Sequence, residues 1–333
     1  MDMKNLDLVG IGNAIVDVLA KTDDTFLKNN HINKGTMTLI EAEGAEKLYE
    51  KMAPGVEMSG GSAANTMAAF ASLGGQGGYI GKVSNDQLGE VFRHDIKAAG
   101  VCFDTPGLDD GPSTARCLIL VTPDAQRTMC TYLGACVWIG PEDLNAAMIS
   151  NAKVTYLEGY LFDKDRAKKT FIKASEIAHG AGRDVALTLS DPFCVNRHRA
   201  EFMDLISNHI DILFANEAEI MALFETSSFD EAADKIRNHC KVAVLTRSEK
   251  GSLIVSRDKA YKVAAEKVAK VVDTTGAGDA YAAGFLYGYT RDMSLPDCGR
   301  IASIVAAEII GQMGARPQRN LAKLVQEKMR GAA

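Results

Sequence analysis

The chain lacks the sequence features that mark secreted, membrane-spanning and nucleic-acid-binding proteins. Its 7 cysteines are odd in number and form no Cys-x-x-Cys pair, and no basic region followed by an apolar stretch opens the chain, so neither a disulfide framework nor a secretory signal is indicated. No apolar run approaches the roughly 20 residues that span a bilayer. The net charge is -6 without long runs of one sign, which disfavours nucleic acid and membrane surfaces as partners. We expect a cytoplasmic protein that binds a small molecule.

Two common nucleotide-binding fingerprints are also missing. The stretch GIGNAIVDV begins like a dinucleotide-binding G-x-G-x-x-G motif, but Ile15 stands at the third glycine position, and the branched residues there favour a strand over a helix. The stretch GGYIGKVS is not a P-loop, because Gln76 replaces the glycine six positions before Lys82 and no Ser or Thr follows the lysine. Any nucleotide site must therefore be built in another way.

What the chain does contain is a regular alternation of strand and helix patterns. The hydrophobic content of 47% over 333 residues is ample for a large buried core. Strands are expected near 153–157, 184–189, 210–214 and 242–246, with helices starting near 163, 197, 216 and 229. This alternation predicts an α/β fold with one doubly wound, mainly parallel sheet.

The most informative stretch is VVDTTGAGDAYAAGFL, which starts at Val271 and predicts a strand, a tight turn and a helix start. Gly276 and Gly278 allow backbone N–H groups to converge, and the positive end of the helix dipole faces the same point, so the turn can hold an anion. Asp279, in the first turn of that helix, can accept a proton from a hydroxyl group. The alternative is an ordinary strand-to-helix connection with a capping Asp.

The segment DTTGAGDAYAAGF resembles the C-terminal signature of the ribokinase, or PfkB, family of carbohydrate and nucleoside kinases. The resemblance implies a ribokinase-like three-layer α/β/α sandwich with a small β lid. It places residues 1–12, 41–104 and 137–333 in the large domain, and residues 13–40 and 105–136 in the lid. It also makes Asp279 the general base, with the amides of Gly276, Ala277 and Gly278 around the transferring phosphoryl group.

A second signature agrees with the first. MSGGSAANT resembles the N-terminal family signature, which implies that Gly60 and Gly61 touch the substrate and that Asn65 binds its hydroxyls. The end of the first strand supplies Asn13 and Asp17 at the matching substrate-binding positions, and a carboxylate can accept from two vicinal hydroxyls. The alternatives are a turn residue at Asp17 and, after a cap at Ser62, a helix with a buried asparagine.

The resemblance also suggests residues that contact the substrate from the lid and from the end of a central strand. Met37 and Leu39 lie on one face of a short strand that would form part of the lid, although packing within the lid explains them equally well. An aromatic residue of EGYLF, either Tyr160 or Phe162, could pack on a base. The stretch QRTMCTYLGAC is closer to the adenosine kinase branch of the family, in which Arg127 would reach the phosphates; a solvated hairpin arginine is the alternative.

ATP and metal ions are implied at three further segments. In NEAE, Asn216 and Glu219 match the motif that holds hydrated Mg²⁺ and phosphates, whereas helix capping is the alternative. In TRSEKGS, Thr246 and Gly251 match a turn that binds ATP, and a basic surface turn is the alternative. The segment 306–317 resembles the one that closes the adenine pocket, with the matching positions Gly311 and Gly314, and it would complete a monovalent cation site, such as one for K⁺, with Asp273 and Thr275.

We therefore expect ATP-dependent phosphorylation of the 5'-hydroxyl of adenosine. The alternatives are a sugar kinase of the same family, acting on ribose, fructose or a related sugar, and an ATP-responsive binding protein without turnover. Monomers and homodimers both occur in the family. The sequence therefore leaves the oligomeric state open.

Overall fold

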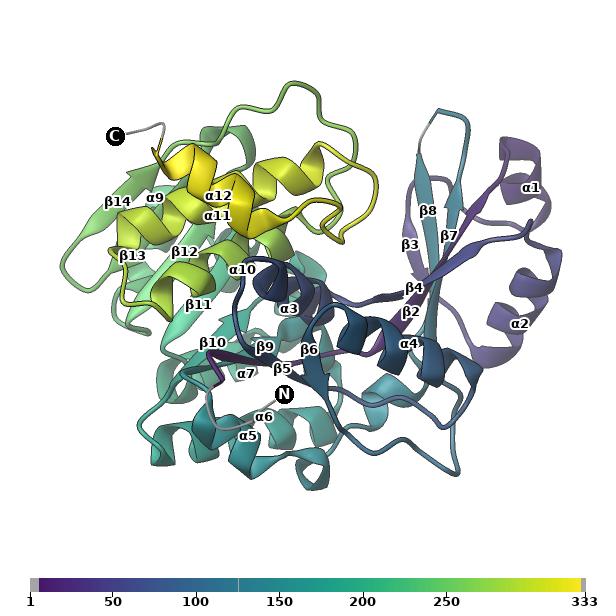
Figure 1. Cartoon of the computed structure of the whole chain (residues 1–333), viewed down its shortest axis with the longest axis horizontal. Coiled ribbons are helices and arrows are strands. Elements are labelled where there is room, and N and C mark those ends of the chain that lie inside the picture. The colour runs from purple at the N-terminus through teal and green to yellow at the C-terminus, as the bar shows by residue number, and fades with distance from the viewer. Residues whose placement is uncertain (1–5, 125, 331–333) are drawn as a thin grey trace.

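Two β-sheets of unequal size carry the structure, a computed structural model that describes residues 6–124 and 126–330 (Figure 1). Residues 1–5, 125 and 331–333, which fall within the ranges assigned above to the large domain and the lid, lie outside the described residues. The larger sheet has 9 strands and the smaller has 5.

The larger sheet is doubly wound, as the alternating pattern predicts. Its strands run in the order β14-β13-β12-β11-β10-β9-β1-β5-β6, and those from β12 to β6 are parallel. Their bounds are β1 Leu8–Ile11, β5 Gly77–Ile80, β6 Val101–Phe103, β9 Val154–Glu158, β10 Asp184–Thr188, β11 Ile212–Asn216, β12 Val242–Thr246, β13 Ser252–Ser256 and β14 Ala260–Val263. Because β1 lies between β5 and β9, the chain changes direction across the sheet there, which is where parallel α/β sheets bind ligands.

Helices cover both faces of this sheet and give the three layers (Figure 1). In β1, Leu8 packs into one core while Val9 and Ile11 pack into the other, as the two-residue period of a strand requires. The first face carries α3 Ser62–Ser72, α4 Gln87–Ala98, α10 Ala277–Tyr289, α11 Leu295–Ile310 and α12 Leu321–Arg330. The second carries α5 Ala146–Asn151, α6 Asp165–Gly180, α7 Pro192–His209, α8 Glu217–Leu223 and α9 Phe229–Ile236. None of the described helices is long and apolar enough to cross a membrane.

The smaller sheet forms a lid at one side of the large layer (Figure 1), with the strand order β3-β8-β7-β2-β4. Its elements are β2 Ile15–Lys21, β3 Met37–Leu39, β4 Val56–Gly60, β7 Ala115–Val121 and β8 Arg127–Tyr132, together with α1 Asp24–Asn29 and α2 Ala42–Lys51. The strand β4 pairs with β2, so residues 56–60 belong to the lid sheet and not to the large domain in which the sequence division placed them.

Three local predictions have clear outcomes. The branched residues after Asn13 form the strand β2, as expected, which removes the dinucleotide-binding interpretation. The strand expected at Val271 is wrong, because residues 265–274 form no strand and Val272 N–H instead donates to Ile310 O at the end of α11. The helix expected near 197 already begins at Pro192, because Asp191 caps it.

Candidate active site

The anion turn stands at the start of α10. Gly276 is the N-cap residue with φ 76, a left-handed conformation, and a Cβ at this position would lie 2.5 Å from Ala315 Cβ, so glycine is required on both counts. The N–H of Ala277 donates to Thr274 O at 3.2 Å and is therefore engaged within the turn. The amides of Gly278 and Asp279 belong to the first helical turn, whose N–H groups have no acceptor within the helix. These two amides, more than that of Ala277, can hold an anion.

Asp279 is held by residues of a second helix, α3. Ser62 Oγ donates to Asp279 Oδ1 at 2.6 Å, and Asn65 Nδ2 donates to Asp279 Oδ2 at 3.3 Å. The cap expected at Ser62 is wrong: the N-cap of α3 is Gly61, and the Ser62 hydroxyl serves Asp279 instead. The N-termini of α3 and α10 thus meet at one carboxylate. Both helix dipoles favour negative charge at this point.

A second carboxylate, Asp17 of β2, stands against the glycine pair. A Cβ at Gly60 would lie 2.4 Å from Asp17 Oδ2, and one at Gly61, where φ is 95, would lie 2.2 Å from Asn13 O. The pair is therefore needed for the close approach of β2 and β4, which brings Asn13, Asp17, Gly60 and Gly61 together as the family resemblance implies. The contact of these four residues with substrate stays a prediction.

Both carboxyl groups have raised pKa values. Burial raises the pKa of Asp279 to about 6, against the opposing effects of the Ser62 and Asn65 hydrogen bonds and of the Arg316 charge. Burial also raises the pKa of Asp17 to about 6, opposed by the charges of Arg316 and Arg127. A carboxylate with a pKa near 6 is ionised at neutral pH and is a stronger base than an exposed one.

Asn13 is positioned by a residue that the sequence analysis did not assign. Asn13 Nδ2 donates to Glu158 Oε1 at 2.7 Å, and Ala63 N–H donates to Glu158 Oε2 at 2.8 Å, so the buried Glu158 at the end of β9 ties β1 to α3. Asn13 Oδ1 is buried and has no partner within the described part of the chain, which leaves it as an acceptor for a hydroxyl donor. Glu158 was detectable only as a polar residue at the end of an apolar strand.

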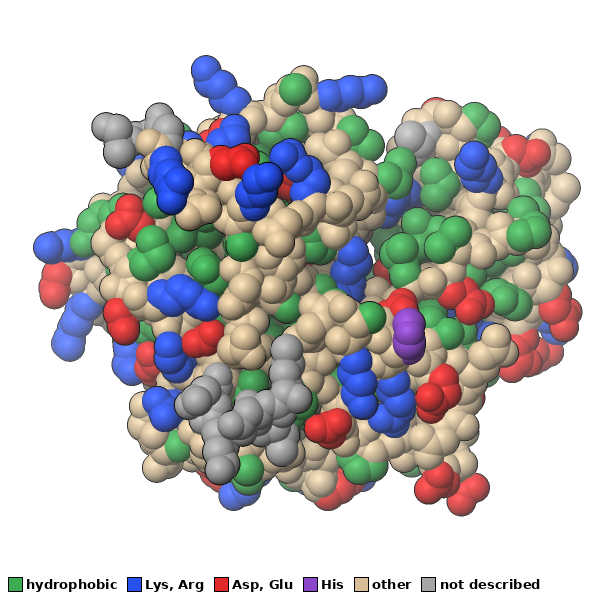
Figure 2. Space-filling model, in the orientation of Figure 1, with side chains coloured by type: hydrophobic (Ala, Val, Ile, Leu, Met, Phe, Trp, Pro, Cys, Tyr) green, Lys and Arg blue, Asp and Glu red, His purple; other side chains and the backbone are tan. Residues whose placement is uncertain are grey.

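Three of the four residues expected to contact the substrate from the lid and from the end of a central strand are exposed, and the fourth is buried. Met37, Leu39 and Tyr160 are exposed by 49%, 55% and 41%, so each is free to contact a ligand. Figure 2 shows hydrophobic side chains gathered on the lid beside the hollow that separates it from the large layer. Phe162 is wrong as a base-stacking residue: it is buried, and its ring stacks on Phe202 with centroids 4.4 Å apart.

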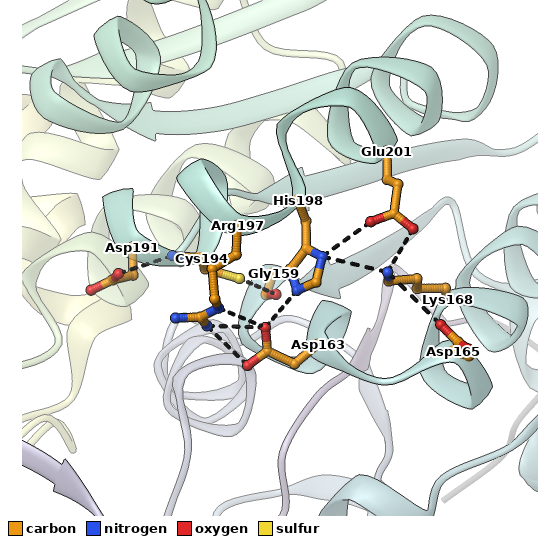
Figure 3. A network of polar contacts seen from close by, with 9 residues as sticks. All are labelled: Gly159, Asp163, Asp165, Lys168, Asp191, Cys194, Arg197, His198 and Glu201. Carbon is orange, nitrogen blue, oxygen red and sulfur yellow. Dashed lines mark hydrogen bonds and ion pairs between the residues drawn. The ribbon is translucent and has the colours of Figure 1, made fainter.

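A polar network fixes the short helix η3, Gly159–Asp163, which carries Tyr160 (Figure 3). Arg197 Nη2 donates to Asp163 Oδ2 at 2.9 Å, and His198 Nε2 lies 2.8 Å from Asp163 Oδ1, so α7 holds one end of η3. Cys194 Sγ donates to Gly159 O at 3.3 Å and holds the other end. The network therefore sets the position of Tyr160 without taking part in the site.

Arg127, the first residue of β8, reaches from the lid to the large layer. Its Nη2 lies 2.7 Å from Asp273 Oδ2, and Nη1 donates to Thr275 Oγ1 at 3.4 Å, so it is not a solvated hairpin arginine. Asp273 also accepts from Gly314 N–H at 2.8 Å and from Thr275 Oγ1 at 2.7 Å. With its oxygens engaged in this way, Asp273 does not fit a monovalent cation while Arg127 is in place.

The helix start at α8 shows the capping geometry in full. Glu219 N–H donates to Asn216 Oδ1 at 2.9 Å, and Asn216 Nδ2 donates to Glu219 Oε1 at 2.6 Å. Burial raises the pKa of Glu219 to about 7, opposed by the backbone hydrogen bond from Asn216. A nearby cation would favour the ionised form. This small oxygen donor set fits a mostly hydrated Mg²⁺ and not a fully coordinated ion, because no metal-binding group of three or more His, Cys, Asp or Glu occurs among residues 6–124 and 126–330.

The remaining nucleotide positions lie at strand and helix ends. Thr246 ends β12, and Gly251 follows η4, Ser248–Lys250, with φ 83, where a Cβ would lie 2.1 Å from Val263 O. Gly311 is the C-cap of α11, and Gly314 N–H donates to Asp273. Arg247 is not free for phosphate, since Nη2 donates to Glu217 Oε1 at 2.8 Å. ATP contacts at these glycines and at Thr246 stay predictions.

Comparison with known proteins gives consistent matches over nearly the whole chain. The pfkB family of carbohydrate kinases matches residues 36–321. The solved structure of adenosine kinase from Sinorhizobium meliloti is 52% identical, covers 99% of this chain and 100% of that chain, and superposes with a TM-score of 0.90. A probable sugar kinase protein from Rhizobium etli CFN 42 is 48% identical over 99% of this chain and 100% of that chain, with a TM-score of 0.91. Adenosine kinase 2 of Arabidopsis thaliana is 25% identical, covering 92% of this chain and 94% of that protein.

Proposed function

The chain belongs to the pfkB family of carbohydrate kinases, and within that family we propose that it transfers the γ-phosphoryl group of ATP to the 5'-hydroxyl of adenosine. The observation that carries the proposal is the convergence of α3 and α10 on Asp279. A base at this point, next to free amides of a helix N-terminus, provides both requirements of phosphoryl transfer to an alcohol.

The reaction follows from the chemistry of Asp279. At neutral pH the carboxylate is ionised, since its pKa is about 6, and it already accepts the hydroxyl hydrogen of Ser62. A substrate hydroxyl that takes the place of Ser62 donates to the same oxygen. As the oxygen–phosphorus bond forms and the bond to ADP breaks, the hydroxyl proton passes to Asp279.

The negative charge on the transferring group is balanced by the start of α10 and by groups around it. The amides of Gly278 and Asp279 would donate to the phosphoryl oxygens, and Arg127 stands beside the turn through its contact with Thr275. Asn216 and Glu219 would hold a hydrated Mg²⁺, which when bound neutralises charge on the phosphate oxygens. ATP would lie along the strand ends at Thr246 and Gly251.

Adenosine is favoured over a sugar by two features. The first is the 52% identity to an enzyme named adenosine kinase, in a match that covers 99% of this chain. The second is the exposed apolar surface of Met37, Leu39 and Tyr160, which suits a flat purine base. The ribose hydroxyls would be bound by Asp17, by Asn65 and by the free Oδ1 of Asn13.

A sugar kinase of the same family is the second candidate, because a protein named as a probable sugar kinase is 48% identical over the same length. The test is product analysis. Purified protein is incubated with ATP, Mg²⁺ and either adenosine, ribose or fructose, and nucleotides are separated by chromatography. Equal formation of AMP and ADP from adenosine supports the proposal. Sugar phosphate with no AMP supports the second candidate, and no turnover with any acceptor supports an ATP-responsive binding protein.

A further inference from the structure

Arg316 lies between α11 and α12, in the segment 306–317 that resembles the one closing the adenine pocket, but the resemblance assigned no role to the arginine itself. Its Nη1 donates to Ala64 O in α3 at 3.0 Å, and Nη2 donates to Ser59 O in β4 at 3.0 Å. Nη2 also donates to Ser59 Oγ at 3.1 Å, and Nε donates to Ser59 O at 3.2 Å. Ser59 and Ala64 flank Gly60 and Gly61. The guanidinium therefore fixes the corner at which the lid strand β4 meets the helix α3.

The residues just before Arg316 contact the anion turn. Gly314 N–H donates to Asp273 Oδ2 at 2.8 Å. Ala315 packs closely on Gly276, since a Cβ added at Gly276 would lie 2.5 Å from Ala315 Cβ. Three consecutive residues thus join the turn that precedes α10 to the glycine corner that precedes α3. This segment sets the spacing between the two halves of the site.

The charge of Arg316 is not used in a direct ion pair. Within the described part of the chain its guanidinium hydrogen-bonds only to uncharged oxygens of Ser59 and Ala64. Burial lowers the pKa of Arg316, and the negative charges of Asp17, Asp95 and Asp279 and the Tyr79 side chain oppose that effect. A half-buried cation among neutral acceptors is costly unless nearby carboxylates balance it. Here those carboxylates include the two at the centre of the site.

Several other charged or titratable groups face these carboxyls. Asp17 faces Arg316, Arg127 of β8, Asp279 of α10 and Cys117 of β7. Asp279 faces Arg316, Asp17 of β2, Glu158 and Tyr156 of β9, and Tyr160 of η3. Among the groups with positive charge, Arg316 acts on both carboxyls, and its effect on Asp17 exceeds that of Arg127.

We infer that Arg316 is a positioning residue of the kinase reaction: its guanidinium fixes the Gly60–Gly61 corner against α3 and supplies the positive charge that keeps Asp17 and Asp279 ionised. The inference deepens the proposed function and rests on it. Arg316 itself touches neither carboxylate. It acts through the backbone of Ser59 and Ala64 and through its electric field.

The test compares Arg316→Gln, which removes the charge, with Arg316→Lys, which keeps the charge but loses the planar fork. The control is Arg237→Gln at the C-cap of α9, since Arg237 Nη1 also donates to two backbone carbonyls, of Ser256 at 3.0 Å and Lys259 at 3.3 Å. The acidic limb of the kcat/KM–pH profile should move up by about one pH unit in Arg316→Gln, and should stay near the wild-type position in Arg316→Lys and Arg237→Gln. If both Arg316 variants lose activity equally and the acidic limb of the kcat/KM–pH profile stays in place, Arg316 has only a structural role.

A second readout needs no catalysis. Because the folded-state pKa values of Asp17 and Asp279 are raised, ionising these groups costs stability, which falls as pH rises through about 6. Without the Arg316 charge the two pKa values rise further. The fall in Tm between about pH 5 and about pH 8 should then be larger in Arg316→Gln than in wild type, Arg316→Lys or Arg237→Gln. Parallel Tm–pH curves would overturn the inference even if the wild-type protein phosphorylated none of the acceptors.

Discussion

Ser62 and Asp279 lie 217 residues apart in the chain, yet Ser62 Oγ donates a 2.6 Å hydrogen bond to Asp279 Oδ1. This contact joins the first turns of α3 and α10 and leaves the carboxylate bound by a hydroxyl group, as it would be by a substrate alcohol. If Asp279 is the general base, as we propose, a substrate hydroxyl would bind to the same carboxylate beside the anion turn.

Asp279→Asn should abolish most of the activity while ATP and substrate still bind. The amide keeps the size of the side chain but cannot accept the hydroxyl proton, so kcat should fall by roughly 10²- to 10⁴-fold. Steady-state kinetics and calorimetric binding measure the two properties separately. Near-normal kcat would remove Asp279 from the role of general base.

Ser62→Ala should shift the pH dependence of the wild-type reaction. Wild-type kcat/KM should fall as pH drops below about 6, because Asp279 becomes protonated there. The Ser62 hydrogen bond lowers the pKa of Asp279, so its removal raises that pKa and moves the acidic limb to higher pH. The control is Ser175→Ala, which removes a buried hydroxyl bonded to Phe171 O in α6. A limb that moves equally in both variants, or in neither, contradicts this role for Ser62.

The pair Asn216→Ala and Glu219→Ala should affect stability and metal dependence together. Loss of the capping box should cost about 1 kcal/mol of unfolding free energy, and loss of the oxygen donors should raise the Mg²⁺ concentration needed for half-maximal activity. Ser228→Ala is the matched control, because Ser228 caps α9 through a hydrogen bond from Glu231 N–H. If the double variant loses only stability, as Ser228→Ala should, the metal role of the pair is wrong.

Tyr160→Ala should lower catalytic efficiency, whereas Phe162→Ala should lower the stability of the fold. The exposed Tyr160 is proposed to stack on the base, so its loss should lower kcat/KM for adenosine by about 10-fold or more and leave any activity on ribose unchanged. Phe162 packs on Phe171 and Phe202, so Phe162→Ala should cost roughly 3 to 5 kcal/mol of stability. Thermal unfolding and kinetics on both substrates separate these effects. An equal loss on both substrates in Tyr160→Ala would argue against base stacking.

The fold class could be predicted from the sequence because it depends on the local alternation of strand and helix patterns. The residues at the ends of the parallel strands could be predicted because two long family signatures mark the strands and helices around them. The alternation of strands and helices implies a doubly wound sheet, and the parallel strands bring Asn13, Asn216 and Thr246 to the same edge of it. The prediction of a strand at Val271 was wrong although the residues there favour strands. The N–H of Val272 donates to the carbonyl of Ile310 at the end of a helix and not to a strand of the sheet.

Contacts between distant segments could not be predicted in the same way. Tyr160 and Phe162 follow the same strand, and only the turn of η3 decides that one is exposed and the other enters the core. Glu158 and Arg316 lie in stretches that the family resemblance singled out, EGYLF and 306–317, but no role was assigned to either residue, because their partners Asn13 and Ser59 lie 145 and 257 residues away. Arg127 was expected near phosphate, but its pairing with Asp273 depends on how the lid meets the large layer.

The identity of the acceptor is tested by kcat/KM for adenosine, ribose and fructose, measured under one set of conditions with saturating ATP and Mg²⁺. Burial of the base against Tyr160 and the lid residues Met37 and Leu39 should be worth roughly 2 to 4 kcal/mol, so adenosine should exceed both sugars by roughly 30- to 900-fold. Equal or greater efficiency with ribose or fructose would contradict the adenosine kinase assignment and leave the chain as a sugar kinase with the same Asp279 chemistry.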